Sequence, residues 1–243
     1  MTRPKIMTIY GTRPEAIKVA PIISALDKDK RFESIAVSTG QHREMLEQVN
    51  TMFGIEPKLD LRLMKPGQSL NEIVSRALMG LDEVIDAEQP DVIIAQGDTS
   101  TAMAAALAGF HRGVKIVHLE AGLRTGDIDS PFPEEANRKL ITQVAKLHLA
   151  PTEGSMENLR RENVRSKDIA VTGNTVIDAL LEAASWDTEF EDAALQEAAA
   201  SGKRLVVVTT HRRENLEAMK EIGGAVKDLA AAYPNINFVL PLH

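Results

Sequence analysis

Short β-branched runs alternate with amphipathic segments along most of this chain, and that rhythm constrains the fold more than any other feature. Strands are predicted at residues 6–10, 35–38, 92–95, 115–119, 147–150 and 169–172. Helical patterns lie between them, and the clearest begins at Ser69, whose spacing from Glu72 is that of a capping box. Pro133 is expected at the first position of another helix. Alternating strands and helices predict a parallel, doubly wound α/β sheet.

Length and composition predict more than one domain. With 243 residues, of which 44% are hydrophobic, the chain exceeds the usual size of a single domain and can bury a core. The first sheet is expected to be complete near Gly173, and a polar, Ala-rich and acidic stretch over residues 183–203 then precedes a new apolar run at 205–208. We therefore expect a first domain over residues 1–173, followed over 174–243 by a linker helix and the first part of a second domain.

Charge, cysteine content and hydropathy exclude several classes of partner. The chain has 28 basic and 35 acidic residues, a net charge of -7, which argues against a nucleic-acid partner held mainly by phosphate contacts. It has no cysteine, which fits a reducing compartment, so a cytoplasmic location is expected. The apolar run before Gly11 is too short for a signal peptide, and the stretch at 102–110 is far shorter than the roughly 20 residues that span a bilayer. No membrane partner is expected.

Three carboxylates stand where an α/β sheet gathers functional side chains. Asp98 and Glu120 each follow a predicted strand, and open parallel sheets bind ligands at the carboxyl ends of their strands. Glu134 follows Pro133 at a predicted helix start. Two alternatives stay open, because Asp98 could be an N-cap and the helix dipole alone favours an acid at Glu134. Glu120 ends an apolar strand, where an unpartnered acid is costly to bury, so a functional role is favoured there.

Two basic turns are expected to bind an anion. Residues 11–15 include Arg13, and residues 209–214 include His211; each turn joins an apolar run to a helical pattern. Helix N-termini and added cations attract anions, so we expect the two turns to face each other across a cleft between domains. Lys18 is a further candidate ligand, although a solvated helix lysine is the alternative. The chain contains neither a G-x-G-x-x-G nor a P-loop motif, so neither of those phosphate cradles is predicted.

The histidines do not predict a metal centre. The six histidines include no H-E-x-x-H pair and no other spacing typical of metal ligands. His118 lies within a predicted strand, and it is expected to be a buried structural side chain, as is His148. We therefore expect no metal site.

Seven segments, in order along nearly the whole chain, resemble one family of enzymes. They are GTRPEAIK at 11–18, QHREM at 41–45, GDT at 97–99, EAGLRTGD at 120–127, PEEANR at 133–138, GNTVID at 173–178 and HRRE at 211–214. Together they resemble the non-hydrolysing UDP-N-acetylglucosamine 2-epimerases. The resemblance implies two Rossmann-like domains in a glycosyltransferase-B-like arrangement, the second incomplete here. It also implies a homodimer, no cofactor, and a role in polysaccharide synthesis for the cell envelope.

The resemblance implies interconversion of UDP-N-acetylglucosamine (UDP-GlcNAc) and UDP-N-acetylmannosamine (UDP-ManNAc). The reaction eliminates UDP in the anti sense to give a 2-acetamidoglucal, to which UDP adds again. The positions that match the family's catalytic residues are Asp98, Glu120, Glu134 and His211, and which carboxylate gives or takes each proton is left open. The positions that match substrate-binding residues are Arg13, Lys18, Arg138 and Asn174.

A second ligand site and the end of the chain complete what the resemblance implies. Gln41, His42, Arg43 and Arg212 match residues near a second UDP-GlcNAc site that activates some bacterial members. Family members continue past His243 into a Ser-Gly-Gly-x-Gln-Glu-Glu segment that helps to bind UDP. We therefore expect this polypeptide alone to bind the UDP-sugar weakly and to have little epimerase activity.

Two other functions stay open at this point. One is that of a hydrolysing relative, which releases N-acetylmannosamine and UDP. The other is not catalytic: the chain would bind a nucleotide sugar without turning it over. Product analysis distinguishes the first from epimerisation, and ligand binding without solvent-deuterium incorporation at carbon 2 identifies the second.

Overall fold

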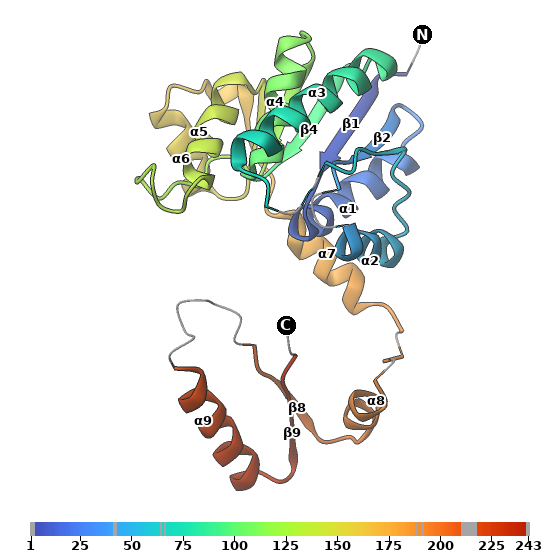
Figure 1. Cartoon of the computed structure of the whole chain (residues 1–243), viewed down its shortest axis with the longest axis vertical. Helices are drawn as coiled ribbons and strands as arrows, with labels where there is room; N and C mark the ends of the chain where they lie inside the picture. The colour runs from blue at the N-terminus through green and yellow to red at the C-terminus, as the bar shows by residue number, and fades with distance from the viewer. Residues whose placement is uncertain are drawn as a thin grey trace. The chain divides into compact units, whose positions relative to one another are not determined.

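The computed structural model describes residues 3–40, 43–63, 65, 67–187, 189–190, 192–209 and 218–241. The chain divides into two compact units, Met1–Ala184 and Ser185–His243 (Figure 1). The first unit therefore includes the helix expected to link the domains. The domain boundary expected at residue 173 stays a prediction.

The first unit is built on a seven-stranded parallel sheet with the strand order β3-β2-β1-β4-β5-β6-β7. The strands are β1 Lys5–Tyr10, β2 Glu33–Ser38, β3 Leu59–Asp60, β4 Val92–Gln96, β5 Lys115–Leu119, β6 Leu147–Ala150 and β7 Ile169–Val171. This confirms the predicted α/β class, and all the predicted strands of this sheet are present. The strand order reverses between β1 and β4, and ligands bind at such a switch point in open α/β sheets.

Helices connect the strands and cover the sheet (Figure 1). They are α1 Arg13–Lys28, α2 Arg43–Phe53, α3 Leu70–Glu88, α4 Ser100–His111, α5 Glu134–Val144, α6 Glu153–Arg161 and α7 Thr175–Ala184, with a short 3-10 turn η1 at Ser166–Asp168. Ser69 caps α3, and both hydrogen bonds of the predicted capping box with Glu72 are formed. Pro133 precedes the first helical residue of α5, so its predicted position was wrong by one residue.

Two apolar layers hold the helices against the two faces of the sheet. Side chains alternate along β1, so Met7 and Ile9 pack in a cluster with α3, α4 and α5, while Tyr10 packs in another with α1 and α2. Strands covered on both faces read as continuous apolar runs, which is why the sequence identified them. His118 and His148 lie side by side on β5 and β6 and are buried, as expected for structural histidines.

Helix α4 packs against the strands through small side chains. Its sequence, STAMAAALAGFH, is rich in alanine, and Gly109 lies in close contact with the sheet. A Cβ atom at Gly109 would lie 2.5 Å from Ile116 Cδ1 and 2.7 Å from Ile93 Cδ1, too short for any carbon contact. This close packing at Gly109 sets the distance of α4 from β4 and β5. It therefore also sets the position of the turn that leads from β4 into α4.

The second unit contains a two-stranded parallel sheet of β8 Arg204–Val207 and β9 Ile236–Val239, with helices α8 Ala193–Ala200 and α9 Met219–Ala232. None of its described residues is buried. Helix α8 lies in the stretch that we read as polar, and no helix was predicted there. Across the described parts of both units, no helix combines the length and apolar character needed to cross a bilayer.

Candidate active site

A pocket of about 350 Å³ opens at the carboxyl ends of β4 and β5, beside the first turn of α1. It therefore lies next to the switch point of the sheet. Its lining residues are Thr12, Pro14, Glu15, Lys18, Gln96, Gly97, Asp98, Thr99, Glu120, Leu123 and Arg138. The pocket thus contains two of the three predicted carboxylates and two of the predicted cations.

Glu120 is held by three donors. Its Oε2 atom accepts hydrogen bonds from Lys18 Nζ at 2.5 Å and Gln96 Nε2 at 2.6 Å, and its Oε1 atom accepts from Asn174 Nδ2 at 2.9 Å. The Glu120 backbone has φ +65°, a left-handed conformation that is uncommon outside glycine and often marks functional sites. Lys18 is therefore not the solvated helix lysine of the alternative interpretation, because its ammonium group pairs with a part-buried carboxylate.

Asp98 is paired with an arginine and does not cap the following helix. The N-cap of α4 is Thr99, whose hydroxyl accepts from Ala102 N at 3.0 Å, so the capping alternative for Asp98 is wrong. Asp98 Oδ2 accepts from Arg138 Nε at 2.8 Å and Nη2 at 2.5 Å. Its backbone oxygen accepts from Asn137 Nδ2 at 2.8 Å. The first turns of α5 therefore bind Asp98 at both its side chain and its backbone.

Glu15 was not predicted as a site residue, yet it joins the two strand-to-helix turns of the pocket. Its Oε2 atom accepts from the backbone N–H groups of Gly11 and Thr12 at 2.8 and 2.7 Å, and its Oε1 atom accepts from the Thr99 hydroxyl at 2.6 Å. Burial raises the pKa of the Glu15 carboxyl, and the hydrogen bonds from Thr99, Gly11 and Thr12 oppose the rise. The capping-box spacing of Thr12 and Glu15 was a signal that could have identified it.

The bonds of Glu15 also change how the first basic turn can bind an anion. We expected backbone N–H groups of residues 11–15 to point toward a bound anion. Two of them, on Gly11 and Thr12, already donate to the Glu15 carboxylate. An anion at this turn would therefore depend mainly on side-chain cations.

His118 supports the turn that carries Asp98. Its Nε2 atom lies 2.8 Å from the carbonyl oxygen of Gly97, so the neutral ring donates its proton there. Its buried Nδ1 atom has no hydrogen-bond partner among the described residues. Burial lowers the pKa of His118 from 6.5 to about 4, with smaller contributions from nearby cationic groups. The side chain is neutral at physiological pH and acts as a fixed donor beneath Gly97.

Three of the predicted residues that the structure describes lie outside the pocket lining: Asn174, which contacts Glu120, and Glu134 and Arg13. Glu134 is the first residue of α5 and is half-buried. Arg13 is exposed and lines a separate groove of about 370 Å³ between α1, α2 and α7, with mostly apolar neighbours such as Met52 and Leu180. The roles expected for Glu134 and Arg13 stay predictions.

Several predicted residues lie outside what the structure describes. They are Gln41, His42, His211 and Arg212. Arg43 is the first residue of α2, but its side chain is not among the described ones. The expected second basic turn and the expected activating site therefore stay predictions as well.

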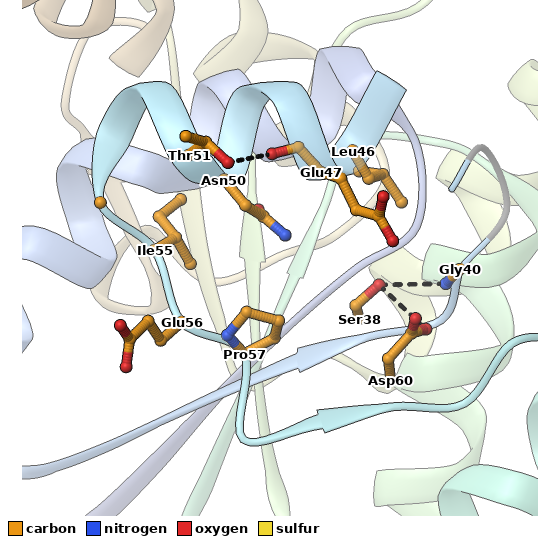
Figure 2. Close-up of a pocket in the computed structure, with 11 residues that line it drawn as sticks. Ser38, Gly40, Leu46, Glu47, Asn50, Thr51, Ile55, Glu56, Pro57 and Asp60 are labelled. Atoms are coloured by element: carbon orange, nitrogen blue, oxygen red, sulfur yellow. Dashed lines mark hydrogen bonds between the residues drawn. The ribbon is translucent and has the colours of Figure 1, made fainter. Parts of the chain in front are cut away.

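A larger cavity of about 550 Å³ lies beside β2, β3 and α2 (Figure 2). Ser38 connects two other lining residues, since its hydroxyl donates to Asp60 Oδ1 and accepts from Gly40 N. The described residues that line it include the acids Glu47, Glu56 and Asp60 but no lysine, arginine or histidine. Such a lining does not suit a diphosphate, so we do not take this cavity as the active site.

Comparisons with known proteins agree on one family. Residues 24–243 match the sequence model of the family described as UDP-N-acetylglucosamine 2-epimerase. The chain is 47% identical over 249 residues to the UDP-N-acetylglucosamine 2-epimerase of Salmonella typhimurium, and 47% identical over 249 residues to that of Escherichia coli K12. Each alignment covers 98% of this chain and 65% of the relative. The chain therefore spans less than two thirds of the length of these curated relatives.

Solved structures of the same kind share the fold. UDP-GlcNAc 2-epimerase from Neisseria meningitidis bound to UDP-GlcNAc matches with a TM-score of 0.83 and 43% identity, over 98% of this chain and 66% of that one. A putative UDP-N-acetylglucosamine 2-epimerase from Listeria monocytogenes matches with a TM-score of 0.88 and 46% identity, over 100% and 64%. The enzyme from Methanocaldococcus jannaschii in complex with UDP-GlcNAc and UDP matches with a TM-score of 0.77 and 31% identity, over 98% and 66%.

Proposed function

The chain belongs to the UDP-N-acetylglucosamine 2-epimerase family, and from this premise we propose that it interconverts UDP-GlcNAc and UDP-ManNAc. One observation carries the proposal within this chain: Asp98 and Glu120 line a single pocket at the ends of neighbouring strands. Each carboxylate contacts its own cation, Arg138 for Asp98 and Lys18 for Glu120. The pocket therefore offers two proton carriers beside positive charge.

The chemistry of the substrate explains why two proton carriers are needed. Carbon 2 of the sugar has no neighbouring carbonyl group, so loss of its proton alone would give a poorly stabilised carbanion. In the proposed reaction a base takes the C2 proton, the electron pair of the C–H bond forms the C1–C2 double bond, and the C1–O bond breaks with its electrons going to UDP. The product pair is 2-acetamidoglucal and UDP. Protonation of C2 from the other face and return of UDP to C1 complete the epimerisation.

We assign the proton transfers at C2 to Asp98 and Glu120, with Glu134 as a third carboxylate of the site. General acid–base groups act when a side chain lies within hydrogen-bond reach of the proton, and two such groups can serve the two faces of a sugar ring. Lys18 and Arg138 pair with these carboxylates and provide positive charge near the leaving diphosphate.

The remaining assignments follow the family resemblance. Asn174 donates to Glu120 and is assigned to orient it. Arg13 and His211 are assigned to the diphosphate. Gln41, His42, Arg43 and Arg212 are assigned to the second, activating UDP-GlcNAc site. We propose further that the protein acts as a cytoplasmic homodimer.

Solvent-deuterium incorporation tests the proposed function. The chain is incubated with UDP-GlcNAc in D₂O, and the products are followed by NMR, with the longer Salmonella typhimurium relative as the positive control. We expect deuterium at C2 of both UDP-sugars and formation of UDP-ManNAc, at a rate well below that of the longer relative, and turnover near that of the relative would contradict the expected low activity. Free N-acetylmannosamine and UDP would instead indicate the hydrolysing reaction. UDP-GlcNAc binding without any exchange at C2 would refute catalysis by this chain.

The variants Asp98→Asn and Glu120→Gln connect exchange to the pocket. Each removes a titrating group while keeping its size, and we expect each to lower the exchange rate by at least about 100-fold. Exchange that is unaffected by both changes would mean that the chemistry takes place elsewhere.

A further inference from the structure

Glu135 is a fully buried acid to which neither the family resemblance nor the proposed proton transfers assign a role. It lies in the first turn of α5 with 0% of its surface exposed. Its Oε2 atom accepts from Arg138 Nη1 at 3.0 Å and from Thr125 N at 3.2 Å. Its Oε1 atom is buried and has no hydrogen-bond partner in the part of the chain that the structure describes. Burial of a carboxylate with an unpaired oxygen costs stability, so its presence here calls for a functional reason.

Arg138 joins Glu135 to Asp98. The Nε and Nη2 atoms of the guanidinium donate to Asp98 Oδ2, and Nη1 on its other side donates to Glu135 Oε2. A planar guanidinium bonded along two edges has its orientation fixed. Burial works against the cation, but Asp98 and Glu135 together raise the pKa of Arg138 above its usual value. Arg138 is therefore a fixed cation shared by two acids.

The charged groups near Asp98 on β5, directly after it and on α1 are already compensated. Directly after β5, Glu120 is paired with Lys18, and on β5 His118 is neutral beneath Gly97. From α1, Glu15 is bonded to the Thr99 hydroxyl and to two backbone N–H groups. Among the described residues, the cation that contacts Asp98 is Arg138. How strongly Asp98 is stabilised as an anion therefore depends on how Arg138 is shared.

We propose that Glu135 is a positioning residue for the epimerisation, which acts through Arg138 to orient Asp98 and to keep it basic enough to exchange the C2 proton. This inference rests on the proposed function. An arginine devoted to one carboxylate stabilises the anion and weakens it as a base. A second carboxylate bound to the same guanidinium offsets the stabilisation of the first anion. The hydrogen bonds of Arg138 to both acids also hold Asp98 in place.

The alternative is that Glu135 only supports the fold, through its bond to Thr125 N. The two roles predict different results for Glu135→Gln, which keeps the shape and an acceptor but removes the charge. A supporting role predicts a loss of stability alone. The positioning role predicts that Arg138 then serves Asp98 alone, so Asp98 becomes a weaker base that stays ionised at lower pH.

The test compares kcat and KM for C2 deuterium exchange across pH in the wild type and in Glu135→Gln, with urea unfolding as the measure of stability. For Glu135→Gln we expect kcat to fall about tenfold with KM within about twofold, and the acid limb of the profile to move about one unit to lower pH, the small end of the usual effect of an opposite charge. Glu135→Asp keeps the charge and should leave the acid limb in place while lowering kcat. If Glu135→Gln does not fold, Glu135→Asp takes its place in the test. A shift of the acid limb in Glu135→Asp would then overturn the proposal.

Glu162→Gln is the matched control. Glu162 pairs with Arg124 through two bonds of 2.7 Å, and Arg124 is as well buried as Arg138, but neither residue lines the pocket. We expect this variant to lose stability without any shift of the pH profile. The two proposals can fail separately: no exchange by the wild type refutes the proposed function, whereas exchange with superimposable profiles for the wild type and Glu135→Gln refutes only the role of Glu135.

Discussion

Acidification should destabilise the first unit through His118. The folded protein has no described acceptor for a proton on Nδ1, while the unfolded chain offers water. Because burial lowers the pKa of His118 from 6.5 to about 4, the unfolded state binds the proton more readily than the folded state. The stability that comes from the neutral ring is therefore fully present above pH 6.5 and is lost as the pH falls toward 4.

The size of the effect follows from that pKa difference. A fall from 6.5 to about 4 corresponds to a total of about 3 kcal/mol. At pH 5 the unfolded histidine is almost fully protonated and the folded one is not, so about 2 kcal/mol of the total is already lost. We therefore expect the contribution of His118 to the free energy of unfolding to drop by about 2 kcal/mol between pH 7.5 and pH 5.

The assay must report on the first unit alone, and its buried methionines provide that report. Met7 on β1 is 0% exposed, so hydrogen peroxide oxidises it only when this unit unfolds. Oxidation of Met7 is measured by mass spectrometry against urea concentration at both pH values, and the midpoints give the free energies of unfolding.

The control is His118→Gln, whose amide can donate to Gly97 O but does not titrate. Carboxylates titrate in both proteins, so the difference between them isolates the histidine. We expect the wild type to lose about 2 kcal/mol more than the variant between the two pH values. Equal losses in both proteins would contradict the assignment of a low pKa to His118 and the neutral donor that we place under Gly97.

Three further outcomes are expected. Gly122→Ala should destabilise the first unit by more than about 2 kcal/mol, because φ is +87° and the new Cβ would lie 2.2 Å from a backbone oxygen. The control is Gly126→Ala, where φ is +85° but the new Cβ would meet open space. It should cost about 1 kcal/mol in the same urea assay. Glu15→Gln should become more stable relative to the wild type as the pH rises from 4 to 7, because the raised pKa makes ionisation of the buried acid unfavourable; a constant difference in urea midpoints would argue against that shift. Lys18→Met should lower C2 exchange by at least about tenfold, because Glu120 loses its cation; unchanged exchange would exclude a role for the pair.

The sequence predicted the elements that carry a clear apolar run or helical period, whether they are buried or exposed. Strands β1 and β4 are covered on both faces and consist mostly of apolar residues. Strand β3 is two residues long and has no such run, and Asn237 interrupts the apolar pattern of β9. Helix α8 has no buried face, so its alanines and acids resemble a linker.

Site residues could be predicted from the sequence where they follow a strand. They could not be predicted where their role depends on contacts with residues that are distant in the sequence. Asp98 and Glu120 directly follow strands and could be singled out. Glu15 and Glu135 have the same local pattern as Glu72, an acid in the first turn of a helix. Glu72 is exposed, whereas the other two are buried, and only the packing of distant elements distinguishes them. The bond between Arg138 and Asp98 likewise joins residues 40 positions apart.

The close packing of α4 on the sheet links the position of a reactive carboxylate to a residue that lies outside the pocket. Asp98 stands on the turn just before α4, and Gly109 sets how near the helix can come to β4 and β5. A larger residue at Gly109 would push the far end of α4 away from Ile116 and Ile93 and so tilt the acid at its start. Divergence or directed evolution could thus change the aim of a reactive group by exchanging hydrogen for methyl about three turns away, without replacing any residue that lines the cavity.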